Sequence, residues 1–566
     1  MFKLDLKKTI AAGLFAGLSM ASFAQTARVQ IIHNSADDAA EEVDVYLNGD
    51  LLVDDFAFRT ATAFIDAPAG EEIEIDIAPS TSVSVDESIA NFPLTLMDGS
   101  TYVVVADGIT GLSPTDYSPA PAFGLEIYDM GREEATMATN TDVLVHHGST
   151  DAPTVDVFES YVPAGTIVDD APYTAFAGYL ELGTADYTLE IQNATGSVVV
   201  ASYEAPLASL ELEGAALTVV ASGFLDPSVN GDGPAFGLWV ALPEGGDLIE
   251  LPKSISRLQV IHNSADDIAE EVDIYLNGAL LLDDFAYRTA TPFIDAPAGV
   301  DIEIAVAPGT SMDVDDAIAI FPLTLASRSK YIVVADGITG LSATDYTPAP
   351  AFGLEIYDMA REEASTSGNT DVLVHHGSTD APTVDVFETS VPAGTLVDNA
   401  AYPQFAGYLE LVTADYLLEV RNEAGDVTVA GYAAPLSTLA LDDAAITVVA
   451  SGFLDPSANG DGPAFGLWVA LASGGDLIPL PTAFVGVNEL TELEFNIFPN
   501  PTTEFITINV ENNETINEII ITDINGRIVQ TSSFSKQISV SELEEGMYFL
   551  NINTAEGIST RSFIKH

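Results

Sequence analysis

The chain has 566 residues, with 17 lysines and arginines against 86 aspartates and glutamates, which gives a formal net charge of −69. A field of this sign repels nucleic acids and anionic lipid, so we expect no nucleic-acid partner. The sequence has no cysteine, so disulfides, thiolate nucleophiles and cysteine-bound zinc are also excluded. The length predicts several domains.

The N-terminus has the pattern of a signal peptide. Three lysines precede a short apolar run, which ends at the small residues Ser22 and Ala24. We expect residues 1–24 to be removed by cleavage between Ala24 and Gln25. No later stretch reaches the ~18 continuous apolar residues that a membrane helix needs. The sequence therefore predicts an exported protein whose mature chain has no transmembrane segment.

The next 440 or so positions contain a long repeat. The stretch HNSADDAAEEVDVYLNG begins at His33, and HNSADDIAEEVDIYLNG begins 229 positions later at His262. Within each copy the motif recurs more weakly, first as HGSTDAPTVDVF from His147. Self-similarity at a fixed period indicates an array of modules. We predict four modules in the order A-B-A-B, at 28–130, 141–242, 257–359 and 370–471.

Each module shows the pattern of β-strands. Ile73, Ile75 and Ile77 alternate with acidic residues, so one face of this strand is apolar and the other is wet. Short strands separated by Gly, Pro, Asn and Asp turns predict an all-β fold of tandem immunoglobulin-like Greek-key β-sandwiches. We expect each sandwich to close independently, with linkers at 131–140, 243–256 and 360–370 that are short enough for neighbouring modules to touch or to move only modestly.

The repeated skeleton resembles a known family. It consists of His-x-Ser-x-Asp, Val-Asp-Val-Tyr, an Ala-Gly turn and a Tyr-x-Val-Val-Ala-x-Gly strand, and it is similar to the domain of unknown function 4397 family. The resemblance implies an exported bacterial β-sandwich of unknown activity. The signature residues, which we expect to be structural, are His33, Ser35, Asp37, Asp44, His147, Ser149, Asp151, Asp156, His262, Ser264, Asp266, Asp273, His376, Ser378, Asp380 and Asp385.

The signature does not predict an enzyme. On a strand, residues two apart lie ~6.6 Å from each other, whereas a nucleophile and its base must approach within about 3.2 Å. We expect His33, Ser35 and Asp37 to bond to backbone at a strand-to-loop junction instead. No pair of carboxylates with the environment of a glycosidase is visible. A secreted hydrolase remains the less favoured alternative.

A calcium loop is the best metal candidate. DPSVNGDGP at 226–234 recurs as DPSANGDGP at 455–463 and matches the first positions of such a loop, although its twelfth position is Gly237 rather than Glu. The alternative is a Gly/Asn/Asp-rich turn that needs no ion. The candidate ligands are Asp226, Ser228, Asn230, Asp232, Asp455, Ser457, Asn459 and Asp461.

Four aromatic residues near the PAFGL strands have two interpretations. Tyr117, Tyr346, Trp239 and Trp468 could stack on sugar rings, because they have polar neighbours. One tryptophan per sandwich is more often part of the core. We expect core packing.

The composition shifts after a linker at 472–487, and residues 488–566 form a small β domain. Its motif residues are Pro499, Asn500, Pro501, Gly526, Arg527, Gly546, Tyr548 and Lys565. These motifs resemble the sorting domain of type IX secretion cargo in the Bacteroidota; the alternative is a fifth binding module. The resemblance implies handling by the type IX machinery at the outer membrane, removal of the domain, and release or attachment at the cell surface.

These patterns predict an exported, non-catalytic repeat protein, secreted or held at the cell surface, that binds a glycan or a surface through its modules. Repetition favours this interpretation, since linked weak sites gain avidity. The alternative is a structural spacer or coat without a ligand pocket, stiffened by calcium if the loops bind it.

Overall fold

The computed structural model describes residues 25–162, 165–390, 393–483, 495–510, 516–524, 526–533, 535–554 and 558–566. These residues form strands and six single 3-10 turns, with no α-helix among them. Among them, no helix is long and apolar enough to cross a membrane. The proposed cleavage residue Ala24 lies outside the described part, while Gln25 directly precedes the first strand.

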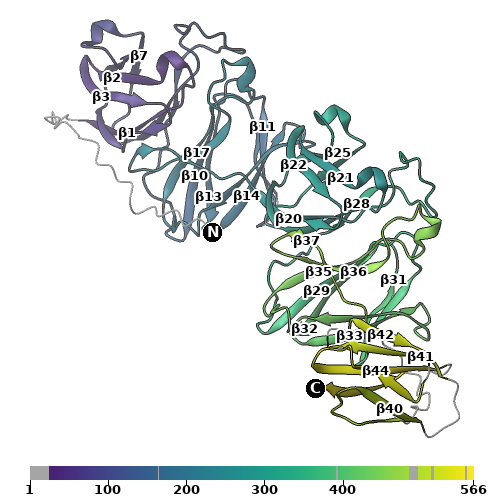
Figure 1. The fold of residues 1–566 in the computed structure, drawn as a ribbon. Coiled ribbons are helices and arrows are strands. Elements are labelled where there is room, and N and C mark those ends of the chain that lie inside the picture. Colours follow the sequence, from purple (N-terminus) through teal and green to yellow (C-terminus); the bar gives the residue numbers. More distant parts are fainter. Residues whose placement is uncertain are drawn as a thin grey trace. The chain divides into compact units, whose positions relative to one another are not determined.

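The chain divides into two compact units, which are described separately. The first comprises residues 1–381, 402–412 and 442–479. The second comprises residues 382–401, 413–441 and 480–566. Figure 1 shows the strands of both along the chain. The 3-10 turns are η1 (Asp38–Ala40), η2 (Val85–Glu87), η3 (Pro227–Val229), η4 (Asp267–Ala269), η5 (Val314–Asp316) and η6 (Pro456–Ala458).

Module one is a sandwich of two sheets. The outer sheet has the order β3-β2-β6-β7, and the inner sheet has the order β4-β1-β8-β9 with β5 also on β1. Strand β1 pairs in parallel with β8. The strands are β1 (Thr26–His33), β2 (Glu42–Leu47), β3 (Asp50–Ala57), β4 (Thr60–Ala61), β5 (Ile65–Pro68), β6 (Glu72–Pro79), β7 (Ala90–Thr95), β8 (Thr101–Asp107) and β9 (Gly124–Tyr128).

Module two repeats this arrangement. Its inner sheet has the order β13-β10-β16-β17-β19, with β10 and β16 parallel, and its outer sheet has the order β12-β11-β14-β15. The strands are β10 (Asn140–His147), β11 (Val155–Glu159), β12 (Gly165–Ala171), β13 (Phe176–Gly183), β14 (Asp186–Asn193), β15 (Val199–Pro206), β16 (Ala216–Ser222), β17 (Gly237–Ala241), β18 (Gly246–Asp247) and β19 (Ile249–Glu250).

The second copy follows the same order. Module three has β20 (Ile255–His262), β21 (Glu271–Leu276), β22 (Ala279–Ala286), β23 (Thr289–Ala290), β24 (Ile294–Pro297), β25 (Asp301–Pro308), β26 (Ala319–Thr324), β27 (Lys330–Asp336) and β28 (Gly353–Tyr357). The inner sheet of module four has β29 (Asn369–His376), β32 (Phe405–Val412), β35 (Ala445–Ser451), β36 (Gly466–Leu471) and β38 (Ile478–Pro479). Strand β37 (Gly475–Asp476) follows β36 in the chain but belongs to the inner sheet of module three. In the second unit, β30 (Val384–Glu388), β31 (Gly394–Ala400), β33 (Asp415–Asn422) and β34 (Thr428–Pro435) form one sheet.

The segment at 243–256 is not a linker, contrary to our expectation. Strand β18 pairs with β4 of module one, and β19 pairs with β17 of module two. Part of the predicted linker at 472–487 is likewise strand, since β37 pairs with β23 of module three; residues 484–487 lie outside the described residues. The chain after each B module thus returns to the sheet of the preceding A module.

Modules one and two each have a core of their own, but their inner sheets also pack against each other. In β8, Tyr102 and Val104 enter the core of module one, whereas Val103 and Val105 pack with Leu144 of module two. The two inner sheets therefore bury both of their faces. This explains why β8 and β16 are almost continuously apolar instead of alternating. Modules one and two therefore stack as two sandwiches, with four sheets in all.

The C-terminal domain has seven strands in two sheets. Its order is β39-β40-β43 in one sheet and β42-β41-β44-β45 in the other, around a core that includes Phe495, Leu550 and Phe563. The strands are β39 (Phe495–Phe498), β40 (Phe505–Val510), β41 (Ile516–Asp523), β42 (Ile528–Ser532), β43 (Gln537–Ser539), β44 (Gly546–Thr554) and β45 (Ile558–Lys565).

Candidate functional site at the junction of paired modules

A buried polar network lies at the centre of the first junction. Asn34 follows β1, Asp107 ends β8, and His146 lies on β10 of module two. The Asn34 amide nitrogen donates to Asp107 Oδ1 at 2.7 Å, and His146 Nε2 donates to Asp107 Oδ2 at 2.6 Å. Asn34 also donates to the carbonyl of Gly148, at 3.3 Å. The network therefore ties the two modules together.

The second junction repeats the network. Asn263 donates to Asp336 at 3.1 Å, and His375 Nε2 donates to the other oxygen of Asp336 at 2.8 Å. Burial raises the pKa of Asp336 to about 6, although the hydrogen bond from His375 acts in the opposite direction. Both side chains are at most 2% exposed. A substrate in solution cannot reach them, so their geometry suits joining the modules rather than chemistry.

His33, Ser35 and Asp37 of module one each hydrogen-bond to the backbone. His33 Nε2 donates to the Ala40 carbonyl at 2.7 Å, and the Ser35 hydroxyl donates to the Gly108 carbonyl at 2.7 Å. Asp37 instead accepts from a backbone N–H, that of Thr110, at 2.6 Å. Burial lowers the pKa of His33 to about 4, which keeps its ring neutral at pH 7. Each side chain thus holds a loop of its own module.

Equivalent contacts recur in the other modules. His147 donates to the Pro153 carbonyl, Ser149 to Gly223, and Asp151 accepts from the Leu225 N–H. In module three His262 donates to Ala269, Ser264 to Gly337, and Asp266 accepts from the Thr339 N–H. In module four Ser378 donates to the Gly452 carbonyl, and Asp380 accepts from the Leu454 N–H. His376 is 2% exposed.

The Val-Asp-Val aspartates support a bulge in the neighbouring strand. Asp44 is 1% exposed and accepts from the N–H of Asp55 at 3.1 Å, where the backbone of Asp55 is left-handed with φ 51°. Its other oxygen accepts from the Ser82 hydroxyl. Asp156, Asp273 and Asp385 make the same bond to residues 170, 284 and 399.

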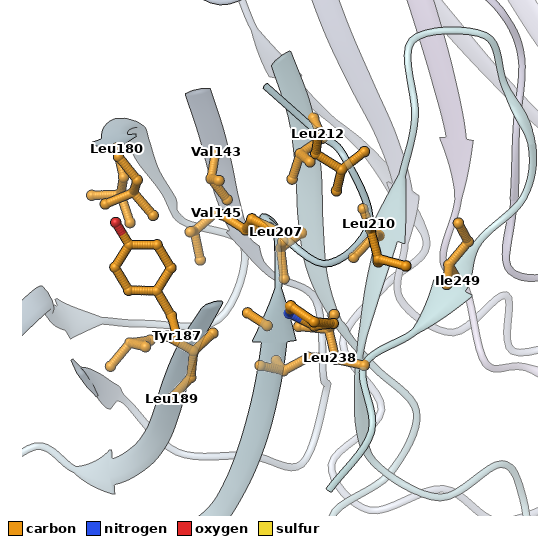
Figure 2. A pocket seen from close by; sticks show the side chains of 18 of the residues that line it. Val143, Val145, Leu180, Tyr187, Leu189, Leu207, Leu210, Leu212, Leu238 and Ile249 are labelled. Carbon is orange, nitrogen blue, oxygen red and sulfur yellow. The ribbon is translucent and has the colours of Figure 1, made fainter. Parts of the chain in front are cut away.

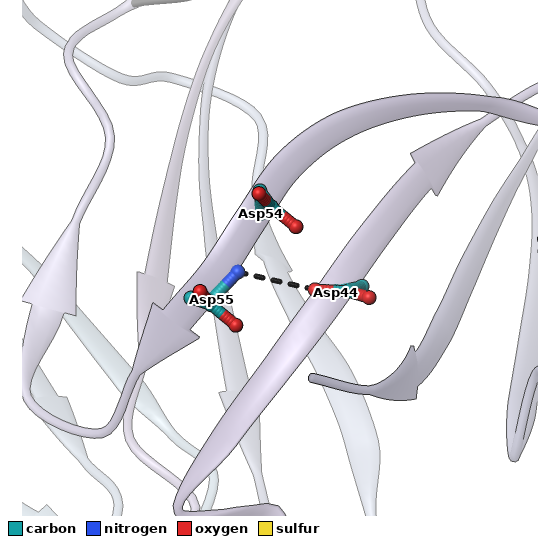
Figure 3. A group of neighbouring side chains, drawn as sticks. All are labelled: Asp44, Asp54 and Asp55. Atoms are coloured by element: carbon teal, nitrogen blue, oxygen red, sulfur yellow. Dashed lines mark hydrogen bonds between the residues drawn. The ribbon is translucent and has the colours of Figure 1, made fainter. Parts of the chain in front are cut away.

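Figure 3 shows that Asp44 has two acidic neighbours, Asp54 and Asp55. One carboxylate oxygen from each lies within 4.8 Å of the others, and Asp273, Asp283 and Asp284 form a second such group. Both oxygens of Asp44 already accept hydrogen bonds, and Asp54 and Asp55 are exposed. Support of the bulge is sufficient to explain the buried carboxylate.

The loop predicted to bind calcium connects the modules. Asn230 is fully buried; its side-chain oxygen accepts from the Ser118 N–H of module one at 2.9 Å, and its nitrogen donates to Asp151 at 3.1 Å. Asp226 accepts from the N–H and hydroxyl of Ser228, at 3.0 and 2.6 Å. Asn459, Asp455 and Ser457 repeat these contacts.

Asp232 and Asp461 adopt left-handed backbone, with φ 54° and 56°, and their side chains are exposed. Hydrogen bonds therefore account for the loop without an ion, and calcium binding stays a prediction. Equal thermal midpoints in excess calcium and in chelator would exclude it.

A groove opens beside the second junction. It has a volume of about 340 Å³ and includes residues of modules three and four, among them Asp267, Glu270, Tyr287, Tyr346 and Asp461. Three of its carboxylates, those of Asp267, Glu270 and Asp461, are exposed. The groove thus combines acceptors for hydroxyl groups with two aromatic side chains.

The four aromatics lie across the junctions. Tyr346 stacks on Phe453 with ring centroids 5.5 Å apart, and its hydroxyl accepts from the Asp267 N–H at 2.9 Å. Tyr117 stacks on Phe224 at 5.4 Å. The Arg59 guanidinium lies 4.0 Å from the ring centre of Trp239, and Arg288 lies 4.1 Å from that of Trp468. All four residues thus contact the partner module.

The sorting motif is built into the C-terminal fold. The side chain of Asn500, between Pro499 and Pro501, accepts from the Ile564 N–H at 2.9 Å and donates to the Ser562 carbonyl at 3.0 Å. Tyr548 stacks on Phe563, two residues after Gly546 begins β44. Gly526 has φ 74°, which suits the turn between β41 and β42. Lys565 is 8% exposed, whereas the Arg527 side chain is 78% exposed.

Comparison with known proteins identifies these parts. Residues 27–121 and 141–231 match the family described as Domain of unknown function (DUF4397). Residues 496–566 match the Secretion system C-terminal sorting domain. The chain carries DUF4397 modules and a type IX sorting tail. Both predicted resemblances are confirmed, and the tail indicates export, with secretion or attachment at the cell surface.

Comparisons with curated proteins and with solved structures give no information about function. No curated protein matches the chain. The Bacillus anthracis TIE protein is 8% identical over 76% of each chain, with a TM-score of 0.15. The N-terminal four Ig domains of Dscam1 isoform 8.4 are 10% identical over 76% of this chain and 97% of that one, with a TM-score of 0.11. Scores this low support no argument about arrangement or function.

Sequence reasoning missed the junction residues Asn34, Asp107 and Gly148. The available signal was the run of apolar residues on both faces of the strand at 102–106, which predicts a sheet covered on both sides. The exact repetition of Asn34 and Asp107 as Asn263 and Asp336 was a second signal.

Proposed function

We propose that this chain is an exported, non-catalytic protein, secreted or attached to the cell surface, whose module pairs bind a glycan. The groove at the junction supports this proposal best. Exposed carboxylates accept hydrogen bonds from sugar hydroxyls, and aromatic side chains offer apolar faces to sugar rings. Asp267, Glu270 and Asp461 supply the acceptors, and Tyr287 and Tyr346 the rings.

The first pair has most of the same chemistry. Thr115 donates to Asp38, and the Asp38 N–H donates to the Tyr117 hydroxyl, as Thr344, Asp267 and Tyr346 do in the second pair. Two linked sites gain avidity of about 10²–10⁴-fold over one site when both can engage. Duplication of the pair is therefore useful to a protein that holds a repetitive ligand.

The test is glycan binding by the full exported chain. We expect Glu270→Gln with Asp461→Asn to weaken binding to a polysaccharide about 10²–10⁴-fold through lost avidity. The additional changes Glu41→Gln and Asp232→Asn should abolish binding. The control, Asp50→Asn with Glu244→Gln, removes the same charge from exposed positions outside the groove and should bind normally. Binding that is unaffected by all four changes would contradict the proposal.

The alternative is a structural spacer, which the buried junction network favours because it fixes two modules together. A chain that binds no polysaccharide in a broad glycan screen would support the spacer. Release of shortened glycans during incubation would instead support the hydrolase.

A further inference from the structure

Module two contains an apolar cavity between its two sheets. The cavity has a volume of about 240 Å³. Figure 2 shows side chains from both sheets converging on it, among them Val143, Tyr187 and Leu238. The corresponding spaces in modules three and one are about 20 and 10 Å³. The fold itself therefore does not require the cavity, since the A modules pack without it.

Module two has a longer connection beside the cavity. Residues 207–215 join β15 to β16, whereas the shorter segment 96–100 joins β7 to β8 in module one. Leu207, Leu210 and Leu212 on this connection line the cavity (Figure 2). The leucines recur in sequence as Leu436, Leu439 and Leu441 of module four.

The lining decides which ligand fits. Almost all of it is hydrocarbon: the Tyr187 hydroxyl already donates to the Gly183 carbonyl at 2.5 Å, and Glu250 contributes the single charged side chain of the lining. A charged or strongly polar group would lose its hydration there without a partner. An apolar cavity of about 150 Å³ accepts benzene, so this larger one has room for such a ring or for part of an alkyl chain.

We propose that module two binds a neutral hydrocarbon group, an alkyl chain or a small aromatic ring, in the cavity between its sheets. Protein interiors rarely keep voids larger than a water molecule, and three leucines of the connection at 207–215 line this one. The cavity is separate from the junction groove, so this proposal does not depend on whether the chain binds a glycan.

The experiment uses the full-length chain with labelled leucine methyl groups, titrated with toluene and with 1-octanol. We expect saturable NMR shifts at Leu207, Leu210 and Leu238. Tighter binding of octanol would assign an alkyl chain, and tighter binding of toluene a ring. Shifts that are absent, or that rise linearly on surface methyls, would overturn the proposal.

A matched pair of substitutions locates the site. Val219→Phe fills the cavity, so the shifts should disappear while the thermal midpoint stays nearly constant. Val104→Phe places the same side chain at the equivalent position of module one, where the space is about 10 Å³. It should keep the shifts in module two but lower the midpoint by roughly 2–8 °C through overpacking.

If Val219→Phe prevents module two from folding, Ala205→Leu replaces that variant in the test. It fills the cavity from the opposite sheet with a smaller side chain. Retention of the shifts in a folded cavity-filling variant would also overturn the proposal.

Discussion

His33 illustrates how single polar residues serve this fold. Its ring is fully buried beside Phe56 and Phe58, with centroid distances of 5.7 and 6.3 Å, and Nε2 donates to a backbone carbonyl. Such a position favours the neutral ring because a charged one would lose its hydration. The same physics applies to the buried Asp336, whose pKa is raised to about 6 by burial.

The first prediction concerns pH. Burial lowers the pKa of His33 to about 4, below the ordinary 6.5 that the unfolded chain retains. Between pH 6.5 and 4 the unfolded chain therefore binds a proton at His33, while the folded chain does not. The contribution of His33 to the free energy of unfolding is fully present above pH 6.5 and is lost as the pH falls toward 4. The loss for this residue should reach about 3 kcal/mol.

Chemical denaturation of wild type and His33→Gln at several pH values measures this loss. The acidic background is common to both chains, so the difference isolates His33. The wild-type midpoint should fall more steeply toward pH 4. Parallel profiles would contradict the prediction.

At the scale of elements, the inner sheets determine how modules associate. Strands β10 and β17 direct Val143 and Leu238 into their own sandwich, and Leu144 and Trp239 toward module one. The alternation of side chains along a strand makes this division unavoidable once both faces are covered. The close approach of the sheets leaves little room at the polar network.

Gly148 tests that packing. A Cβ atom at this position would lie 2.1 Å from the Asn34 side-chain nitrogen and 2.8 Å from Asp107 Oδ1. We expect Gly148→Ala to destabilise the first pair by about 1–3 kcal/mol through overpacking, measured by chemical denaturation. Gly165→Ala is the control, since a Cβ there meets nothing within 4 Å. Equal stability of the two variants would refute the account of the junction.

At the scale of the whole molecule, the sorting tail is the part that indicates export. The tail has its own core of residues such as Ile506 and Phe563, and it matches a sorting family by itself. The modules therefore need not contribute to its recognition.

Removal of residues 488–566 should prevent the chain from crossing the outer membrane of the native strain. We expect the truncated protein in the periplasmic fraction and the full-length protein at the surface or in the medium, as measured by fractionation of tagged chains. Resistance of the truncated protein to mild proteolysis serves as the folding control. Equal export of both chains would show that another segment carries the signal.

Much of this protein follows from its sequence, because repeats, strand periodicity and the sorting motifs are local patterns. The repeat of 229 residues, the all-β class and the family motifs are read directly from it. The fit of the Asn230 side chain between two modules could not be predicted, since its partners Ser118 and Asp151 are distant in sequence. Which apolar face of a strand meets its own sandwich and which meets the next, and how large a space remains between sheets, depend on long-range packing. Only the tertiary structure decides these, and they determine the junction and the cavity.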